Sequence, residues 1–197
     1  MAMEDFVTSL DLHTRGGVRA ARTNHYLVTG SNIKELRDAV ALLGPKRDGR
    51  AFGGFTAWAL RWTFAARPNG RGFETTRITV AVDAIVTLPR WEMTRSAEGA
   101  TRTEWNRYVL ALADHEAGHV AVATAAADDV AALLHDLQAE SPLSLHRKGD
   151  RLARERVAIA RSEEDAYDVR TRHGLSQGAR LGLAQASRLE PESSRCA

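Results

Sequence analysis

Cysteine is almost missing from this chain of 197 residues: the single one, Cys196, lies next to the C-terminal end. One cysteine cannot form an intrachain disulfide or a cysteine-based metal site. No uninterrupted apolar run approaches the roughly 20 residues that span a bilayer, and the first residues lack a basic segment followed by an apolar one. These absences predict no membrane insertion. They also predict a cytoplasmic location for the chain as given, or a secreted or periplasmic one if an export signal has been trimmed.

An excess of one charge is also missing. Lys and Arg number 27 and Asp and Glu 25, and the basic residues are scattered among acids. Nucleic-acid-binding surfaces gather Lys and Arg on one face, so no nucleic-acid partner is expected. With 44% apolar and 26% charged residues, the composition is that of a globular protein. The length suits one domain, which we place at residues 25–189, between an N-terminal extension (1–24) and a polar tail (190–197).

The first half of the chain is typical of strands around one helix. Residues 25–28 predict a short strand, and residues 33–43 follow with apolar side chains at helical spacing. Ser31 or Asn32 is the expected N-cap, and Gly44-Pro45 the stop, with the glycine as the C′ residue. Between residues 52 and 88 the apolar period is two, which predicts two long strands joined by a turn at 67–70. Their aromatic face could bind a ligand, but packing in a core is favoured.

The second half is helical. A helix begins near Thr101 and continues to Ala127, and Asp128-Asp129 are expected to cap a second helix that ends at Ser141-Pro142. A third helix is predicted from about residue 149 to 169, with Gly174 ending it. The predicted fold class is therefore α+β: a small antiparallel sheet packed on the helix that begins near Thr101, with two further C-terminal helices.

The segment His115-Glu116-Ala117-Gly118-His119 carries the chemistry. Two histidines four residues apart on a helix differ by only about 40° in direction, so both imidazoles can bind one ion. A catalytic zinc has three protein ligands and a water, and Glu116 is placed to act as the general base on that water. Glycine inside a helix costs about 1 kcal/mol, so we expect a strand or side chain to approach Gly118 closely.

The third zinc ligand is sought in residues 167–174. His173 is the first choice, and Asp168 is the second, either as a ligand or as a residue that orients a ligating histidine. His135 and the glutamates of the third helix are further alternatives. Tyr167 either donates a hydrogen bond to the oxyanion of the reaction or packs at the end of the helix.

Over roughly residues 25–180 the chain resembles a bacterial family of mostly secreted proteins, regarded as zinc-dependent proteases and catalogued as a domain of unknown function. The resemblance rests on Gly54-Phe55-Thr56-Ala57-Trp58, Thr87-Leu88-Pro89-Arg90-Trp91, Trp105, the zinc motif, Tyr167-Asp168, Thr171, His173-Gly174 and Gln177-Gly178-Ala179. It implies a zincin-like peptidase with a sheet above the active helix and a substrate added along a strand edge. It also implies His115 and His119 as ligands and Glu116 as the base, with Tyr167, Asp168 and His173 completing the site.

The expected function is that of a zinc metallopeptidase acting on a peptide or peptide-like substrate, with Zn²⁺ as cofactor. One departure from the family is the missing export signal. If this N-terminus is native, the protein is expected to work inside the cell, where an unregulated protease would be hazardous. That departure favours the alternative of a non-proteolytic zinc enzyme, acting on a small molecule or a modified peptide in a biosynthetic pathway. A binding or scaffold module that holds no metal is the third possibility.

Overall fold

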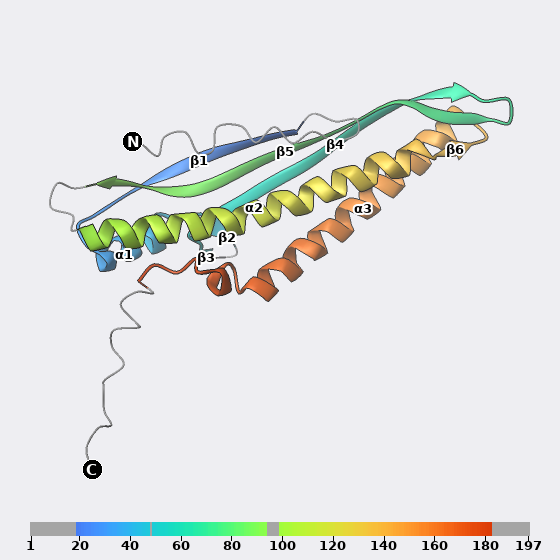
Figure 1. Cartoon of the computed structure of the whole chain (residues 1–197). Helices are drawn as coiled ribbons and strands as arrows, with labels where there is room; N and C mark the ends of the chain where they lie inside the picture. Colours follow the sequence, from blue (N-terminus) through green and yellow to red (C-terminus); the bar gives the residue numbers. More distant parts are fainter. Residues whose placement is uncertain (1–18, 48, 94–98, 183–197) are drawn as a thin grey trace, which may run out of the picture. The chain divides into compact units, whose positions relative to one another are not determined.

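A computed structural model of the chain describes residues 19–47, 49–93 and 99–182 (Figure 1). The polar tail predicted for residues 190–197 and most of the predicted N-terminal extension lie outside the described residues. The elements in chain order are β1 (Arg19–Gly30), α1 (Ile33–Leu43), β2 (Lys46–Arg47), β3 (Arg50–Ala51), β4 (Phe55–Pro68), β5 (Phe73–Met93), α2 (Gly99–His135), β6 (Gln138–Ala139), α3 (Pro142–Thr171) and the 3₁₀ helix η1 (Leu175–Gln177).

The described residues form a sheet and three α-helices, which confirms the α+β class. The main sheet has the strand order β1-β5-β4, and the short β6 pairs antiparallel with β5, Phe73 opposite Ala139. A separate antiparallel pair joins β2 to β3. The predicted hairpin is present as β4 and β5, and along each strand more buried apolar residues alternate with more exposed residues over much of its length, as expected. The strand predicted at residues 25–28 is longer, because β1 begins at Arg19.

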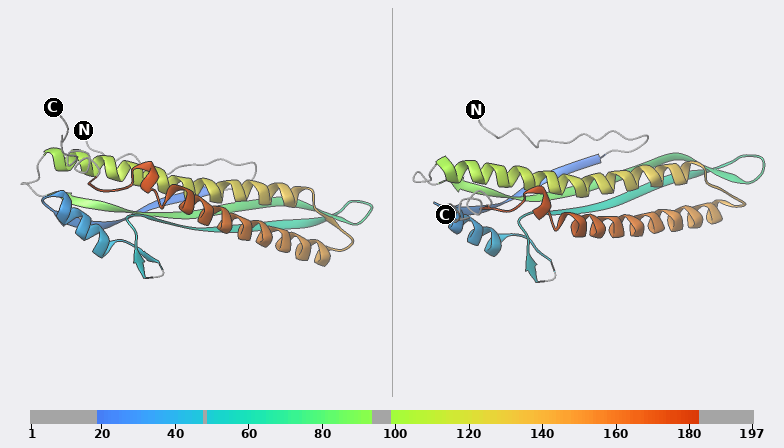
Figure 2. Two further views of the ribbon diagram at one scale, coloured as in Figure 1. Left: turned by 90° about the horizontal axis from the view of Figure 1, so that it is seen from below. Right: turned by 60° about the horizontal axis from the view of Figure 1, so that its bottom comes forward.

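The chain folds into two compact units. The first unit contains Thr56–Val86 and Ala117–Val169 with the start of β1, and the second contains Asn24–Phe55, Thr87–Glu116 and the residues after Val169. The core of the first unit joins the hairpin to the two long helices. Figure 2 shows α3 returning alongside the C-terminal part of α2 after β6. The buried residues of this core are Trp58, Val80, Val82 and Ala84 from the hairpin, Val120, Ala123, Ala126, Ala127, Val130 and Leu134 from α2, Leu137, and Leu145, Ala153 and Ala160 from α3.

The prediction of a helix cap at Asp128-Asp129 was wrong, because α2 is continuous over Gly99–His135. The buried face of α2 continues past the two aspartates through Val130 and Leu134. Asp129 remains at the surface of α2, where its carboxylate accepts a 2.7 Å hydrogen bond from Arg156 of α3. Apolar packing on one face therefore carries the helix past two residues that favour caps.

The prediction that Ser141-Pro142 ends a helix was also wrong, because Pro142 is the first residue of α3. Proline suits this position, since the first helical N–H has no partner within the helix. The hydroxyl of Ser141 accepts a hydrogen bond from the backbone N–H of Ser144 at 3.2 Å. In the part of the chain that the structure describes, one α-helix, α3, follows the motif helix instead of the expected two.

In the second unit, α1 begins and ends where the sequence predicts. The Asn32 side chain caps it by accepting a hydrogen bond from the Glu35 N–H at 3.0 Å, while the Glu35 carboxylate accepts one from the Ser31 N–H at 2.8 Å. Gly44 differs from the expected left-handed C′ residue, since its φ is −60°. Glycine is required there by space instead: a Cβ would collide with the carbonyl oxygen of Phe52.

Among the described helices, α2 is long and apolar enough, by length and composition, to cross a membrane. Core helices of soluble proteins meet the same criterion, and α2 contributes Val120, Ala123, Ala126, Ala127, Val130 and Leu134 to the core of the first unit. The predicted absence of membrane insertion therefore stays a prediction.

Candidate metal centre

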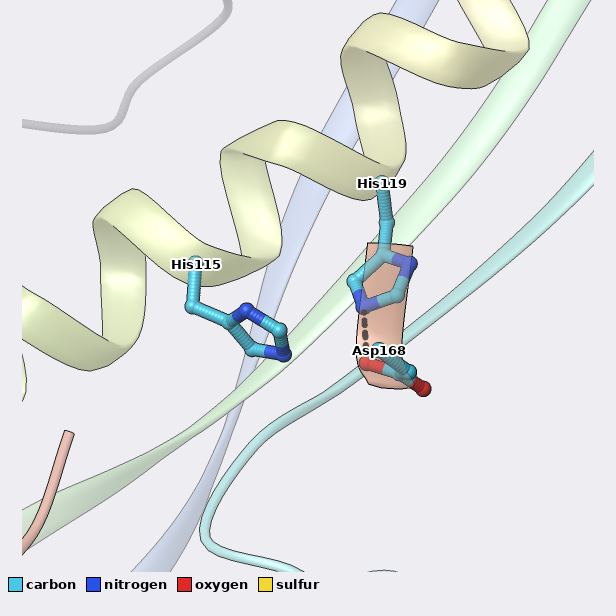
Figure 3. A group of neighbouring side chains, drawn as sticks. All are labelled: His115, His119 and Asp168. Atoms are coloured by element: carbon cyan, nitrogen blue, oxygen red, sulfur yellow. Dashed lines mark ion pairs between the residues drawn. The ribbon is translucent and has the colours of Figure 1, made fainter. Parts of the chain in front are cut away.

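The two histidines of the motif lie on successive turns of α2, and both are buried, with 3% of His115 and 6% of His119 exposed. In the described part of the chain they form one group with Asp168, in which the three potential ligand atoms all lie within 4.8 Å of one another (Figure 3). Two imidazoles and one carboxylate form a donor set that catalytic zinc accepts. The sequence predicted the histidine pair, and the residue grouped with it is Asp168, which was the second choice as third ligand.

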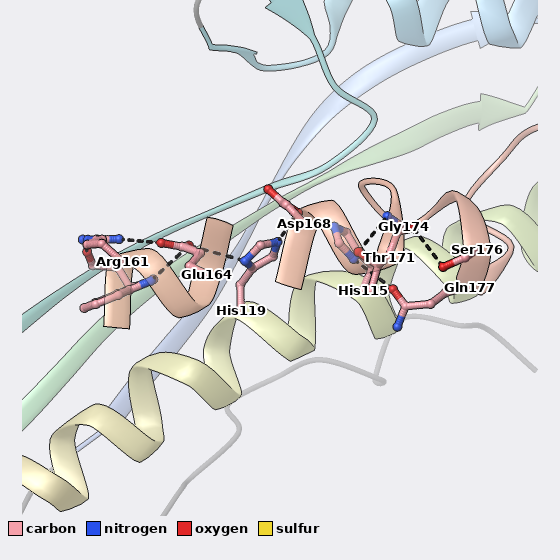
Figure 4. A network of polar contacts seen from close by, with 10 residues as sticks. His115, His119, Arg161, Glu164, Asp168, Thr171, Gly174, Ser176 and Gln177 are labelled. Carbon is pink, nitrogen blue, oxygen red and sulfur yellow. Dashed lines mark hydrogen bonds and ion pairs between the residues drawn. The ribbon is translucent and has the colours of Figure 1, made fainter. Parts of the chain in front are cut away.

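His119 is held by one turn of α3. Its Nε2 atom lies 3.1 Å from Asp168 Oδ1, and its Nδ1 atom lies 3.4 Å from Glu164 Oε1. Glu164 and Asp168 are four residues apart, so both project from the same face of α3 toward the ring (Figure 4). The imidazole thus has a carboxylate at each nitrogen. Asp168, at Nε2, belongs to the metal group, and Glu164, at Nδ1, lies on the other side of the ring.

Glu164 is held in place by three neighbours, which are His119, Trp58 and Arg161. The Trp58 indole N–H donates a 3.1 Å hydrogen bond to Oε1, and Arg161 donates a 3.0 Å hydrogen bond to Oε2. Burial raises the pKa of Glu164, but the interactions with His119 and Arg161 outweigh it and lower the pKa below its ordinary value. Arg161 also lies over the Trp58 ring, 3.5 Å from its centroid. The carboxylate is therefore ionised and rigidly placed as an acceptor.

His115 belongs to the second unit and has a different partner. Its Nδ1 atom lies 3.0 Å from Oε1 of Gln177, on the 3₁₀ helix that follows α3. Gly174 lies against the same ring, where an added Cβ would come within 2.9 Å of Cγ of His115. The ring is thus fixed by an amide on one side and by close backbone packing on the other.

Glu116 is buried, with 3% of its surface exposed. Its carboxylate lies against Gly54, where a Cβ would be 2.7 Å from Oε1. In the same unit the pKa of Tyr108 is raised by burial and by the negative charge of Glu116. Any side chain at position 54 would displace the carboxylate, so the glycine leaves space for the motif glutamate.

The expected close approach to Gly118 is present, and the approaching group is Tyr167. A Cβ at Gly118 would collide with the hydroxyl and the ring of Tyr167. The Tyr167 ring also meets His119 edge-on, with 5.1 Å between centroids. Tyr167 therefore packs between a ligand histidine and the helix backbone.

His173, the first choice as third ligand, is not part of the metal group that the structure describes. It is exposed, and its ring contacts Phe52 edge-on with 5.4 Å between centroids. The reason is the path of the chain: α3 ends at Thr171, and the backbone then turns through left-handed residues, with φ 52° at both Arg172 and His173. His135 lies at the far end of α2, where it is exposed and pairs with Asp136.

Sequence reasoning missed two residues at this centre. Glu164 was only one of several glutamates on the third helix, and Gln177 was quoted without a role. Glu164 carried a usable signal, since Glu164 and Asp168 repeat on α3 the four-residue spacing of the two histidines on α2. Gln177 carried none, because its contact depends on the turn after α3.

Comparisons with known proteins give a family but no activity. Neither a search of curated proteins nor one of solved structures found a match. One family model matches residues 23–174, which include the motif helix, Glu164 and Asp168. Because that match covers most of the chain, the protein belongs to the family described as bacterial protein of unknown function (DUF922).

Proposed function

We propose that this protein is a zinc-dependent hydrolase, a metallopeptidase that uses metal-activated water with Glu116 as general base. The observation that carries the proposal is the group formed by His115, His119 and Asp168, with the buried Glu116 next to His115 in the chain. Asp168 takes the place of the third ligand in this proposal, and His173 does not.

The residues present fit a zinc ion. Ligand atoms around a tetrahedral zinc lie about 3.3 Å apart, and His119 Nε2 and Asp168 Oδ1 are separated by 3.1 Å. Each histidine also has a side-chain oxygen at its other nitrogen, Gln177 Oε1 for His115 and Glu164 Oε1 for His119. Such partners are the usual companions of zinc-ligating imidazoles, because they set which nitrogen keeps its lone pair for the metal.

Each side chain has a task in peptide hydrolysis. A bound zinc ion would lower the pKa of its water toward about 7 and polarise the substrate carbonyl. Glu116, placed by its contact with Gly54, accepts the proton from water and passes it to the leaving amine. Tyr167, whose ring packs beside His119 and whose hydroxyl lies against Gly118, is the proposed hydrogen-bond donor to the oxyanion.

The sheet offers a place for an extended peptide. In the strand order β1-β5-β4 the strand β4 is an outer one, and it begins directly after Gly54. An outer strand can pair with a peptide through backbone hydrogen bonds. We therefore propose a zincin-like arrangement in which the substrate lies along a strand edge near Glu116.

Metal analysis of three purified proteins tests the ligand set. The wild type is expected to hold one equivalent of zinc, Asp168→Ala to lose it, and His173→Ala to retain it. The same donor set also binds Fe(II) in other enzymes, so the analysis should identify the metal. Wild-type protein without metal after purification in the absence of chelators would exclude the proposal, and an Asp168→Ala variant with full occupancy would exclude Asp168.

Cleavage of a diverse peptide library tests the reaction. Loss of a general base typically lowers the rate about 10²–10⁴-fold, so Glu116→Gln is expected to lose cleavage by at least that factor while keeping its zinc. Full activity in Glu116→Gln would remove Glu116 as the base. Zinc in the wild type without cleavage of any peptide would favour a zinc enzyme that acts on a small molecule or modified peptide.

A further inference from the structure

We propose that Gln177 is a positioning residue: its amide oxygen holds His115 in the tautomer with the proton on Nδ1 and the lone pair, which a metal ion needs, on Nε2. The inference rests on the proposed function, because positioning is useful only if His115 is a ligand. It assigns a role to a residue outside the motif, 62 positions later in the chain.

The chemistry of the two groups fixes the direction of the hydrogen bond. Gln177 presents Oε1 to His115 Nδ1 at 3.0 Å, and an amide oxygen can only accept. Nδ1 must therefore carry the proton. In a neutral imidazole the other nitrogen, Nε2, then has the lone pair, which is the state that a metal ligand needs.

The turn after α3 brings Gln177 to this place. Three successive residues, Arg172, His173 and Gly174, have positive φ values of 52°, 52° and 80°. Such values are uncommon for residues other than glycine, and a run of them next to a site suggests a requirement for that exact chain path. The path lets Gly174 pass under the His115 ring and begins η1, where the Gln177 N–H donates to the Gly174 carbonyl at 3.0 Å.

The same turn is anchored on the helix that carries His115. Arg107 of α2 donates a 2.7 Å hydrogen bond to the carbonyl of Gly178 and a 2.5 Å one to that of Arg180. The guanidinium is itself held by two 2.8 Å hydrogen bonds to the buried Glu104. Gln177 and His115 are therefore tied to a common element, so that the amide keeps its distance from the ring.

The other ligand, His119, has the equivalent partner in Glu164, a carboxylate. The two imidazoles thus have acceptors of different charge, a neutral amide and an anion. Because either acceptor keeps a proton on Nδ1, a carboxylate at position 177 should perform the same task as the amide. That expectation separates positioning from simple packing.

The first experiment measures zinc dissociation constants by competition with a chelator. Gln177→Met has a side chain of similar length in which a thioether, only a weak acceptor, replaces the amide, and it is expected to weaken zinc binding about 10–100-fold, as loss of such a partner typically does. Gln177→Glu is expected to stay within a few-fold of the wild type. Leu175→Ala, an exposed neighbour on η1, serves as the control and should bind like the wild type.

A packing role predicts the opposite order, with Gln177→Met unchanged. Zinc bound equally by the wild type and Gln177→Met would overturn this inference alone, whereas a wild type that binds no zinc would overturn the proposed function as well. Equal thermal midpoints of the four proteins show that folding is not the cause of any difference.

Nitrogen NMR of the metal-free protein gives a second measurement that does not depend on zinc. In the wild type His115 is expected to carry its proton on Nδ1, and in Gln177→Met the proton is expected to redistribute between Nδ1 and Nε2. Gln177→Glu should restore the wild-type signal. An Nδ1–H signal that persists unchanged in Gln177→Met would show that Gln177 does not set the tautomer.

Discussion

The two parts of α2 differ in the side chains that they bury, because only the first part buries ionisable groups among its apolar ones. From Ala123 onward the helix buries alanine, valine and leucine, and Ala123, Ala126, Val130 and Leu134 are completely inaccessible to solvent. Between residues 104 and 119 the same helix buries Trp105, Tyr108 and Leu112 together with four ionisable or metal-ligating side chains, each at most 6% exposed: Glu104, His115, Glu116 and His119. One continuous helix thus contains a dry core segment and a polar segment.

Because of this difference, one segment of α2 mainly stabilises the fold and the other mainly forms the candidate site. Burial of apolar surface stabilises the fold by about 25 cal/mol per Å², whereas a buried charged or polar group costs free energy unless it is paired. The polar segment is paired at each of three positions: Glu104 with Arg107, His115 with Gln177 and His119 with Glu164. Mutations in the apolar segment should therefore change the stability of the fold, and mutations in the polar segment should mainly change the site.

The largest effect is expected at the centre of the apolar segment. Leu134→Ala removes a fully buried side chain and should lower the free energy of unfolding by about 2–5 kcal/mol. The folded fraction should still bind zinc with wild-type affinity. Chemical denaturation measures the first quantity and chelator competition the second.

Leu133→Ala is the matched control, since Leu133 is 39% exposed and should cost much less. If Leu134→Ala weakened zinc binding as strongly as it weakened the fold, the two segments would not be separable.

A smaller effect is expected at Gly118, where the polar segment gives way to the apolar one. Gly118→Ala places a methyl group into Tyr167, and such overpacking costs about 1–3 kcal/mol. In a Tyr167→Ala background the collision is gone, and alanine should stabilise the helix by up to about 1 kcal/mol over glycine. The sign of the Gly118→Ala effect should therefore reverse between the two backgrounds.

Denaturation of the four proteins of this double-mutant cycle measures the reversal. The same sign in both backgrounds would mean that Tyr167 is not the reason for the glycine.

The smallest effect is expected for an exposed charge outside α2. Glu35 lies at the start of α1. Hydrogen bonds from the Ser31 backbone and side chain and from the Asn32 side chain, together with the charge of Lys34, lower its pKa below 4.5. Because the folded-state pKa is the lower one, this stabilisation is present above pH 4.5 and disappears as the pH falls through the folded-state value. Glu35→Gln should be slightly less stable at neutral pH, and the difference from the wild type should vanish in acid.

Unfolding free energies of both proteins across pH measure this difference. A difference that grew toward low pH would contradict the assigned direction of the pKa shift.

Several features of this protein follow from local patterns. The alternation of apolar residues predicted the β4–β5 hairpin, and Asn32 with Glu35 marked the start of α1. The spacing of His115 and His119 predicted two imidazoles on one face of a helix. These predictions succeeded because strand and helix periods depend on backbone geometry, which acts over a few residues.

Other features depended on residues far apart in the sequence. The continuity of α2 past Asp128 was decided by a buried face shared with α3 and the hairpin, since tertiary packing exceeds a local capping preference.

By itself, then, the sequence determined that two histidines and a glutamate share one helix. The tertiary structure decided that Asp168 rather than His173 joins them, because α3 carries Asp168 back to α2 while the left-handed turn after Thr171 leaves His173 against Phe52. It also brought Glu164 to His119 and Gln177 to His115, contacts that span 45 and 62 positions. Such contacts require the whole path of the chain, which no local period encodes.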